Sequence, residues 1–281
     1  MSKTLTQNAI NSFDTRVKAA YENGSMLRDS VDVANNIVGS THRFNKIGKG
    51  MAQKRIPQTD VTPMNIVHGN ATATLEDWNA AEYTDIFDQQ KVNYKEQDKL
   101  ATTIANAIGR REDQLILDAL DAAATTLTVA TSVGGAGTNL NTAKCRKARM
   151  LLNKQGVPKG KGERCAVVSS EGMESLLGDS DANTFDKNAI KALVDGEIQV
   201  WLGFTFKEME DRDEGGLPLS GSVRTSYFYH NASAGLAVGI NMRTEINYIA
   251  VKTSWLANGI FSAGAVAIDA LGIVEMSTTE S

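Results

Sequence analysis

The chain has 281 residues, of which 42% are hydrophobic and 22% are charged, and its formal net charge is -4. This length and composition are typical of a globular protein of one or two domains, and they exclude an intrinsically disordered chain. The negative net charge excludes a protein whose whole surface is basic, so any contact with nucleic acid has to come from a local segment.

The cysteines and the apolar segments indicate a soluble chain of the cytosol. Cys145 and Cys165 are two isolated residues, which favours free thiols over a disulfide framework. The first 24 residues lack the apolar core of a secretory signal. The most apolar run, residues 259–274, is interrupted by Asp269 and is shorter than the roughly 20 residues that span a bilayer. We therefore expect no membrane partner.

The first 70 residues show no pattern that would build a hydrophobic core. Residues 1–40 have scattered apolar positions with weak helical periodicity, which predicts an arm that packs on another surface. Residues 41–70 contain prolines and glycines without a sustained period, as extended functional segments often do. If they form strands, Pro57 and Pro63 restrict these strands to edges or ribbons.

Two neighbouring blocks of opposite charge follow. Between positions 43 and 55 all charged residues are basic, namely Arg43, Lys46, Lys49, Lys54 and Arg55. The next block is mainly acidic and includes Glu76, Asp77, Glu82, Asp85 and Asp88. Such blocks suit either a fold-back within one chain or contact between copies of the chain. We take these ten residues as candidate inter-subunit contacts, and prefer a contact ribbon to a nucleic-acid site because Phe44 is the one aromatic residue among the basic positions.

Residues 93–124 carry the longest amphipathic helical pattern, which would extend over about 45 Å. Gly109 within it marks a bend or a point of close packing. A second helix is expected between a cap at Asn141 or Thr142 and Gly156, and a short one over residues 170–178 with its cap at Ser169 or Ser170.

Strands and loops fill the remainder of the chain. Strands are expected over residues 125–132, 164–170, 197–209, 224–230 and 234–240, with a helix over 187–196 and two or three further strands in 245–276. The acidic segment 210–222 predicts a solvent-exposed loop.

No pattern in the sequence indicates a catalytic, cofactor-binding or metal site. The glycine-rich segment 131–140 lacks the Lys-Ser/Thr of a phosphate-binding loop and the spacing of a dinucleotide fingerprint, so we interpret it as a connection. His42, His68 and His230 do not have the spacing of metal ligands. Residues 179–190 lack the glycine and the final acidic residue of a calcium loop. We expect no enzyme activity and no cofactor.

The order of these elements resembles the major capsid protein of tailed bacteriophages, with its Hong Kong 97-type fold. The resemblance rests on residues 82–124, on 147–177 and on the C-terminal run 233–276. It implies an α+β fold with an N-terminal arm (1–40), an extended loop (41–90) and a spine helix (93–124). It further implies a peripheral domain (90–164 and 245–276), an axial domain (165–244) and a tail (277–281).

The resemblance also implies a function and partners. Copies of the chain would assemble as pentamers and hexamers into an icosahedral shell in the virion, built in the host cytoplasm around double-stranded DNA. A portal, a separate scaffolding protein and a decoration protein are the further partners that it implies. Two alternatives stay open, namely the shell of an encapsulin-like nanocompartment and an unrelated enzyme that uses the glycine-rich loop.

Overall fold

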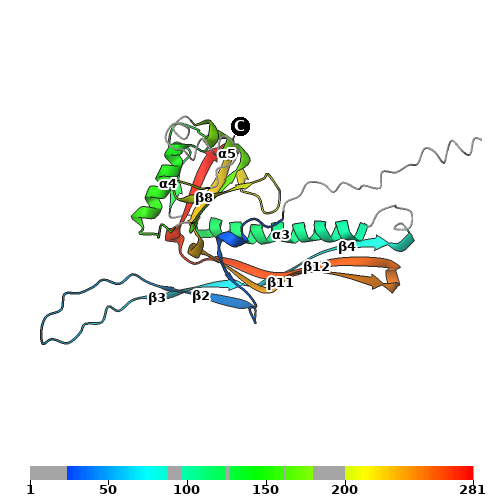
Figure 1. Ribbon diagram of the computed structural model, residues 1–281, viewed down its shortest axis with the longest axis horizontal. Helices are drawn as coiled ribbons and strands as arrows, with labels where there is room; N and C mark the ends of the chain where they lie inside the picture. Colours follow the sequence, from blue (N-terminus) through cyan, green and yellow to red (C-terminus); the bar gives the residue numbers. More distant parts are fainter. Residues whose placement is uncertain (1–23, 88–95, 124–126, 161, 180–199, 281) are drawn as a thin grey trace, which may run out of the picture.

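The computed structural model describes residues 24–87, 96–123, 127–160, 162–179 and 200–280, which form two packed sheets, a long helix and a projecting ribbon (Figure 1). The α-helices are α3 (Glu96–Ala123), α4 (Thr142–Lys154) and α5 (Ser170–Gly178). Short 3₁₀ turns occur at η1 (Arg28–Ser30), η3 (Asn231–Ser233), η4 (Ala250–Lys252) and η5 (Ala270–Gly272).

The long sheet has the strand order β1-β11-β12-β4. Its strands are β1 (Asp32–Ala34), β11 (Ala234–Ile249), β12 (Ser254–Ala267) and β4 (Glu76–Asp85). Helix α3 lies along one face of this sheet (Figure 1). The two approach so closely that a Cβ at Gly259 would come within 2.5 Å of the Ile104 and Ile108 side chains.

The second sheet has the order β5-β13-β10-β6-β8-β7, and β9 pairs with β10. Its strands are β5 (Thr128–Val129), β6 (Arg164–Ser169), β7 (Val200–Trp201), β8 (Phe204–Met209), β9 (Leu219–Ser220), β10 (Val223–His230) and β13 (Ile273–Thr279). We call this sheet, with α4 and α5, the body.

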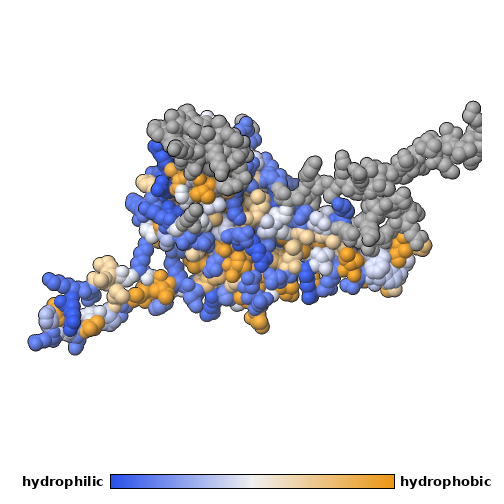
Figure 2. Space-filling view, in the orientation of Figure 1, coloured by the Kyte–Doolittle hydropathy of each residue, from blue (hydrophilic) through white to orange (hydrophobic). Residues whose placement is uncertain are grey.

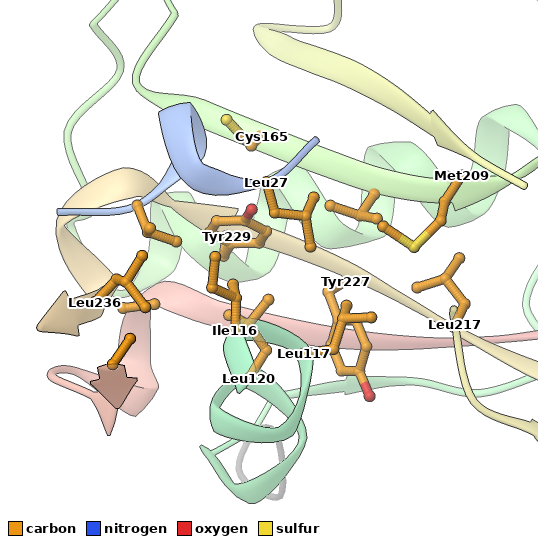
Figure 3. Close-up of a cluster of buried hydrophobic side chains, with 14 of the residues drawn as sticks. Leu27, Ile116, Leu117, Leu120, Cys165, Met209, Leu217, Tyr227, Tyr229 and Leu236 are labelled. Carbon is orange, nitrogen blue, oxygen red and sulfur yellow. The ribbon is translucent and has the colours of Figure 1, made fainter. Parts of the chain in front are cut away.

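Both faces of the body sheet are buried, because it separates two hydrophobic cores. On β10, Tyr227 and Tyr229 point into the core against α3 and the long sheet (Figure 3). Phe228 between them points into the core against α4 and α5. This alternation follows from the two-residue period of a strand. It explains why all six residues of β6 are buried.

Strands β2 (Thr41–Ile47) and β3 (His68–Thr74) form a separate antiparallel ribbon. Thr41 pairs with Thr74 and Ile47 with His68, and residues 48–67 continue outward as an irregular loop. We call residues 41–74 the ribbon. It projects away from the remainder of the chain (Figure 1). Pro57 and Pro63 lie in its irregular part, where no strand partner needs their missing N–H.

Several expected local features are confirmed. Helix α3 lies within the expected limits, and Gly109 is a point of close packing, since a Cβ there would lie 2.5 Å from the backbone N of Ser25. The side chains of Asn141 and Ser169 cap α4 and α5 as expected. The helix expected over 187–196 and most of the rejected calcium loop lie outside the described residues.

The grouping of strands differs from the expected division of the chain. Residues 128–154, expected in the peripheral part, join the body because β5 pairs in parallel with β13 and α4 packs on the same sheet. Strand β13 also continues through Thr279 into the segment expected to be a tail, and the side chain of Glu280 is buried. The structure thus groups residues by their sheets, and the axial and peripheral positions in a shell stay predictions.

Candidate subunit-contact surfaces

Large apolar side chains on the outer part of the ribbon are exposed to solvent. Met51 is 83% exposed and Val61 is 90% exposed, and the other exposed members are Ile47, Ile56, Met64 and Val67. Single exposed apolar residues are common, but a group of six on one projection marks a surface that another molecule covers. Within the part of the chain that the structure describes, no segment covers these side chains.

The base of the ribbon, by contrast, is fixed to the remainder of the chain. Phe44 of β2 is buried against Gly235, where an added Cβ would lie 2.7 Å from the ring. Lys46 forms an ion pair of 2.8 Å with Asp269. Lys49 Nζ donates to the carbonyl of Gln155, 2.6 Å away. These contacts fix the base of the ribbon, so that its outer part projects away from the remainder of the chain (Figure 1).

The two charge blocks of the sequence lie on different elements, the basic block on the ribbon and the described part of the acidic block on β4. Arg43 and Lys46 are on β2, and Lys49, Lys54 and Arg55 are in the irregular loop. The acidic residues Glu76, Asp77, Glu82 and Asp85 lie along β4, which is an edge strand of the long sheet. Asp88 lies outside the described residues. Among these nine described residues no ion pair joins one block to the other, and Lys46 pairs with Asp269 instead. The structure thus does not show the fold-back alternative.

The far end of the long sheet carries a second exposed apolar group, which the strand pattern alone did not predict. Val251 in the turn between β11 and β12 is 97% exposed, and Tyr248 is 45% exposed. The rings of Tyr248 and Trp255 are 5.5 Å apart, and Lys252 Nζ lies 3.9 Å above the ring of Tyr83. Exposed apolar groups therefore occur at both ends of the molecule.

A buried carboxylate joins the arm, the spine helix and the body. Asp113 of α3 is fully buried. It accepts hydrogen bonds from Ser25 Oγ at 3.1 Å, from the backbone N–H groups of Met26 and Leu27 at 2.9 Å, and from Arg212 Nη2 at 2.8 Å. We call this arrangement the Asp113 clasp. The sequence contains no local signal for it, because its members come from three distant segments.

The neighbouring Glu112 makes a second contact between α3 and the arm. Its carboxylate lies 3.0 Å from Arg28, which also donates to the amide oxygens of Asn35 and Asn241. Burial raises the pKa of Glu112, although the charge of Arg28 acts in the opposite direction. Arg28 therefore connects the spine helix, the arm and β11.

Most of the acidic segment 210–222 is exposed, as expected, but its middle is anchored to the remainder of the chain, which was not expected. Arg212 in its middle is almost buried, and its guanidinium pairs with Asp113. Gly215 packs against the backbone of α3, since a Cβ there would lie 2.4 Å from the carbonyl oxygen of Arg110. Leu217 is buried in the core against α3. Arg212 thus anchors the segment to α3, while Asp211, Asp213 and Glu214 stay exposed.

The glycine-rich segment 131–140 is a connection held by Lys144. Gly134, Gly135 and Gly137 have positive φ angles of 86°, 144° and 63°, which side chains rarely adopt. Lys144 Nζ donates to the carbonyls of Thr138 at 2.5 Å and Ser277 at 3.1 Å. Burial lowers the pKa of Lys144 to about 8. Lys144 thereby joins the glycine-rich segment to strand β13 of the body.

The remaining reactive residues are dispersed. Cys145 and Cys165 are free and buried, and burial raises the pKa of both thiols. His42 and His68 lie on the ribbon, whereas His230 lies 3.4 Å from Glu163 at the end of β10. Within the described ranges no three His, Cys, Asp or Glu side chains form a possible metal site. The helices described there include none with the length and hydropathy of a membrane span.

These features define the class of the protein. The body and the long sheet have buried cores, while the ribbon and the far end of the long sheet present uncovered apolar side chains (Figure 2). Such surfaces are typical of a subunit of a larger assembly, because no described segment covers them and contacts with neighbouring copies would bury them.

Comparisons with known proteins identify the family. The model of the phage capsid protein family matches residues 5–280. The chain belongs to this family and is a major capsid protein, a component of the phage head shell in the virion. This membership favours the viral shell over the nanocompartment and the enzyme. No protein with a curated description matches the sequence.

Solved structures show the same α+β fold of the Hong Kong 97 type. The capsid of cyanophage P-SCSP1u matches with a TM-score of 0.76 and 14% identity over 96% of this chain and 93% of that chain. The head structure of Helicobacter pylori bacteriophage KHP40 gives 0.77 and 11% over 95% of each chain. A chain of Mycobacterium phage Che8 gives 0.71 and 15% over 94% of this chain and 95% of that chain.

Proposed function

We propose that the chain assembles as pentamers and hexamers into an icosahedral shell that encloses the double-stranded DNA of a tailed phage. The observation that carries this proposal is the ribbon, whose base is fixed and whose apolar side chains are uncovered. Ordering such a segment costs conformational entropy, which burial against another copy offsets. Repeated contacts of this kind, each between different surfaces of two copies, close into rings.

The charges support a specific pairing of copies. The ribbon carries the basic block, and the edge strand β4 carries the acidic block, with Glu76, Asp77 and Glu82 exposed. A ribbon that reaches the β4 edge of a neighbour would place opposite charges together. It would also cover the unpaired backbone groups of an edge strand, which otherwise invite uncontrolled association.

The proposal includes partners other than copies of the chain. A separate scaffolding protein would direct the closure of the shell, a portal would occupy one vertex, and a decoration protein would bind outside. Packaged DNA would contact the shell without sequence recognition. The exposed apolar surfaces of the ribbon and of the far end of the long sheet support contacts with several neighbours. They do not distinguish among these partners.

The test is a charge reversal with rescue. The protein is produced with the scaffolding protein of its own phage, and particles are counted by negative-stain electron microscopy. The double variant Lys54→Glu/Arg55→Glu is expected to lose closed shells, because its ribbon repels the acidic edge of a neighbour. Combining it with Glu76→Lys/Glu82→Lys is expected to restore them in part.

Two controls separate assembly from folding in this experiment. Each variant is compared with the unaltered protein by circular dichroism and thermal unfolding, which surface substitutions of this kind change little. Reversal of Asp29 and Glu174, which are exposed and lie outside the ribbon and the β4 edge, serves as a control and should leave shells intact. Unaltered protein that stays monomeric with its scaffold would contradict the proposed function.

A further inference from the structure

The outer face of α4 carries a dense group of cations that lies outside both charge blocks. Cys145, Ala148 and Leu152 of this helix point into the core, and the opposite positions are exposed. The helix contains no acidic residue. We define the α4 basic face as the exposed residues Arg146, Lys147, Arg149, Lys154 and, just beyond the helix, Lys159.

These positive charges are not compensated within the described part of the chain, where none of the five cations forms an ion pair. Glu163, which follows Lys159 in the sequence, is already engaged by the N–H of Gly160 and by His230. Burial and then the charge of Arg149 lower the pKa of the neighbouring Arg164. The face therefore concentrates positive charge in a chain whose net charge is -4.

Buried contacts hold the far end of this face in place. Arg164 donates to the carbonyls of Val157 and Pro158 at 2.7 Å and 2.9 Å, and to the side-chain oxygen of Asn153 at 3.0 Å. These bonds fix the segment that carries Lys159 to the C-terminal end of α4. The face is thus a preformed surface of defined shape.

The composition of the face favours a nucleic acid over a protein as its partner. The centres of protein interfaces are apolar and depleted in lysine. In the described chain, Met150 is the one large exposed apolar side chain on α4. Residues 146–154 extend over about 12 Å, and the same length of duplex DNA carries about seven phosphate charges. A cationic surface without an apolar centre matches a phosphate backbone.

We propose that the α4 basic face contacts the phosphate backbone of the packaged double-stranded DNA without reading its sequence. The inference rests on the proposed function, because it requires that the shell encloses DNA. It assigns the contact to a surface on the body and separates it from the ribbon, whose outer cations Lys54 and Arg55 belong to the proposed contact between copies. Phosphate contacts of this type release counterions and weaken steeply with salt.

The experiment measures binding of the full-length, unassembled protein to a fluorescent 30-base-pair DNA duplex of arbitrary sequence. Anisotropy titrations between about 50 and 200 mM salt give the slope of log K against log salt concentration. The test variant is Arg146→Gln/Lys147→Gln, which keeps good helix formers on α4. The matched control is Lys99→Gln/Arg243→Gln, which removes one lysine and one arginine from exposed positions elsewhere.

The test variant is expected to reduce the magnitude of the slope by about 2, at roughly 0.9 per lost phosphate contact, and the control should not change it. An equal reduction of the slope in both variants would show that net charge alone determines DNA binding. An unchanged slope in the test variant would show that the α4 basic face makes no phosphate contact. Either result overturns the inference. Normal DNA binding with loss of shells would assign the face to a protein contact instead, which also overturns it. Because shell formation is scored separately by electron microscopy, failure of the proposed function is distinguishable from failure of this inference.

Discussion

The body and the ribbon differ in the exposure of their apolar side chains, which are buried in the body and exposed on the ribbon. Met276 of β13 is fully buried between the body sheet and α4, whereas Met51 of the ribbon is 83% exposed. The body thus contains the environment that its apolar residues require. The described part of the chain does not provide that environment for the ribbon, which is what a surface that contacts another subunit requires.

The Asp113 clasp allows the strongest test of this difference, because it belongs to the self-sufficient part. Asp113→Ala removes the buried carboxylate that pairs with the almost buried guanidinium of Arg212 and leaves it the half-exposed Glu210 at 3.7 Å. Removal of one partner from a buried ion pair costs about 3 to 5 kcal/mol. Urea unfolding of the unassembled protein should show this loss. Asp118→Ala, at an exposed position of the same helix, is the control, and an equal loss there would refute the importance of the clasp.

A matched pair of methionines tests the comparison directly. Met276→Ala should lower the free energy of unfolding of the subunit by about 2 to 5 kcal/mol, because it leaves a cavity in the core. Met51→Ala should change it by less than about 0.5 kcal/mol, since the side chain is exposed. In light-scattering assembly assays Met51→Ala should raise the concentration needed for shells. Equal effects of the two variants on the subunit would contradict the comparison.

Lys144 provides a smaller effect, with a defined dependence on pH. Because burial lowers its pKa from 10.5 to about 8, the unfolded chain binds more protons than the folded chain between about pH 8 and 10.5. The contribution of Lys144 to stability should therefore rise with pH across this window. Unfolding of the unaltered protein and of Lys144→Met at several pH values measures the difference. A difference that stays constant or falls would contradict the assigned environment of Lys144.

The local features of the fold were readable from the sequence, because they depend on neighbouring residues. The period of residues 93–124 indicated α3, and the polar residues before α4 and α5 indicated their caps. The ribbon could be expected in outline, because residues 41–70 lack any periodic pattern and Pro57 and Pro63 exclude a central strand.

The features that escaped prediction depend on contacts between distant segments. The Asp113 clasp joins residues 25–27 to α3 and to Arg212, and neither the spacing nor the composition of these segments indicates it. For the same reason the anchoring of the largely exposed segment 210–222 through Arg212, Gly215 and Leu217 was not expected. The pairing of β13 with β5 and β10, which adds the C-terminal residues to the body, is likewise invisible to local patterns.

The central claim is that a neighbouring subunit completes the ribbon. Hydrogen exchange followed by mass spectrometry compares peptides from residues 48–67 in the unassembled protein and in closed shells, with peptides of β6 as an internal reference. The account predicts fast exchange of residues 48–67 before assembly and strong protection in shells, while β6 stays protected in both states. Protection of residues 48–67 in the unassembled protein, or fast exchange that persists in closed shells, would contradict it.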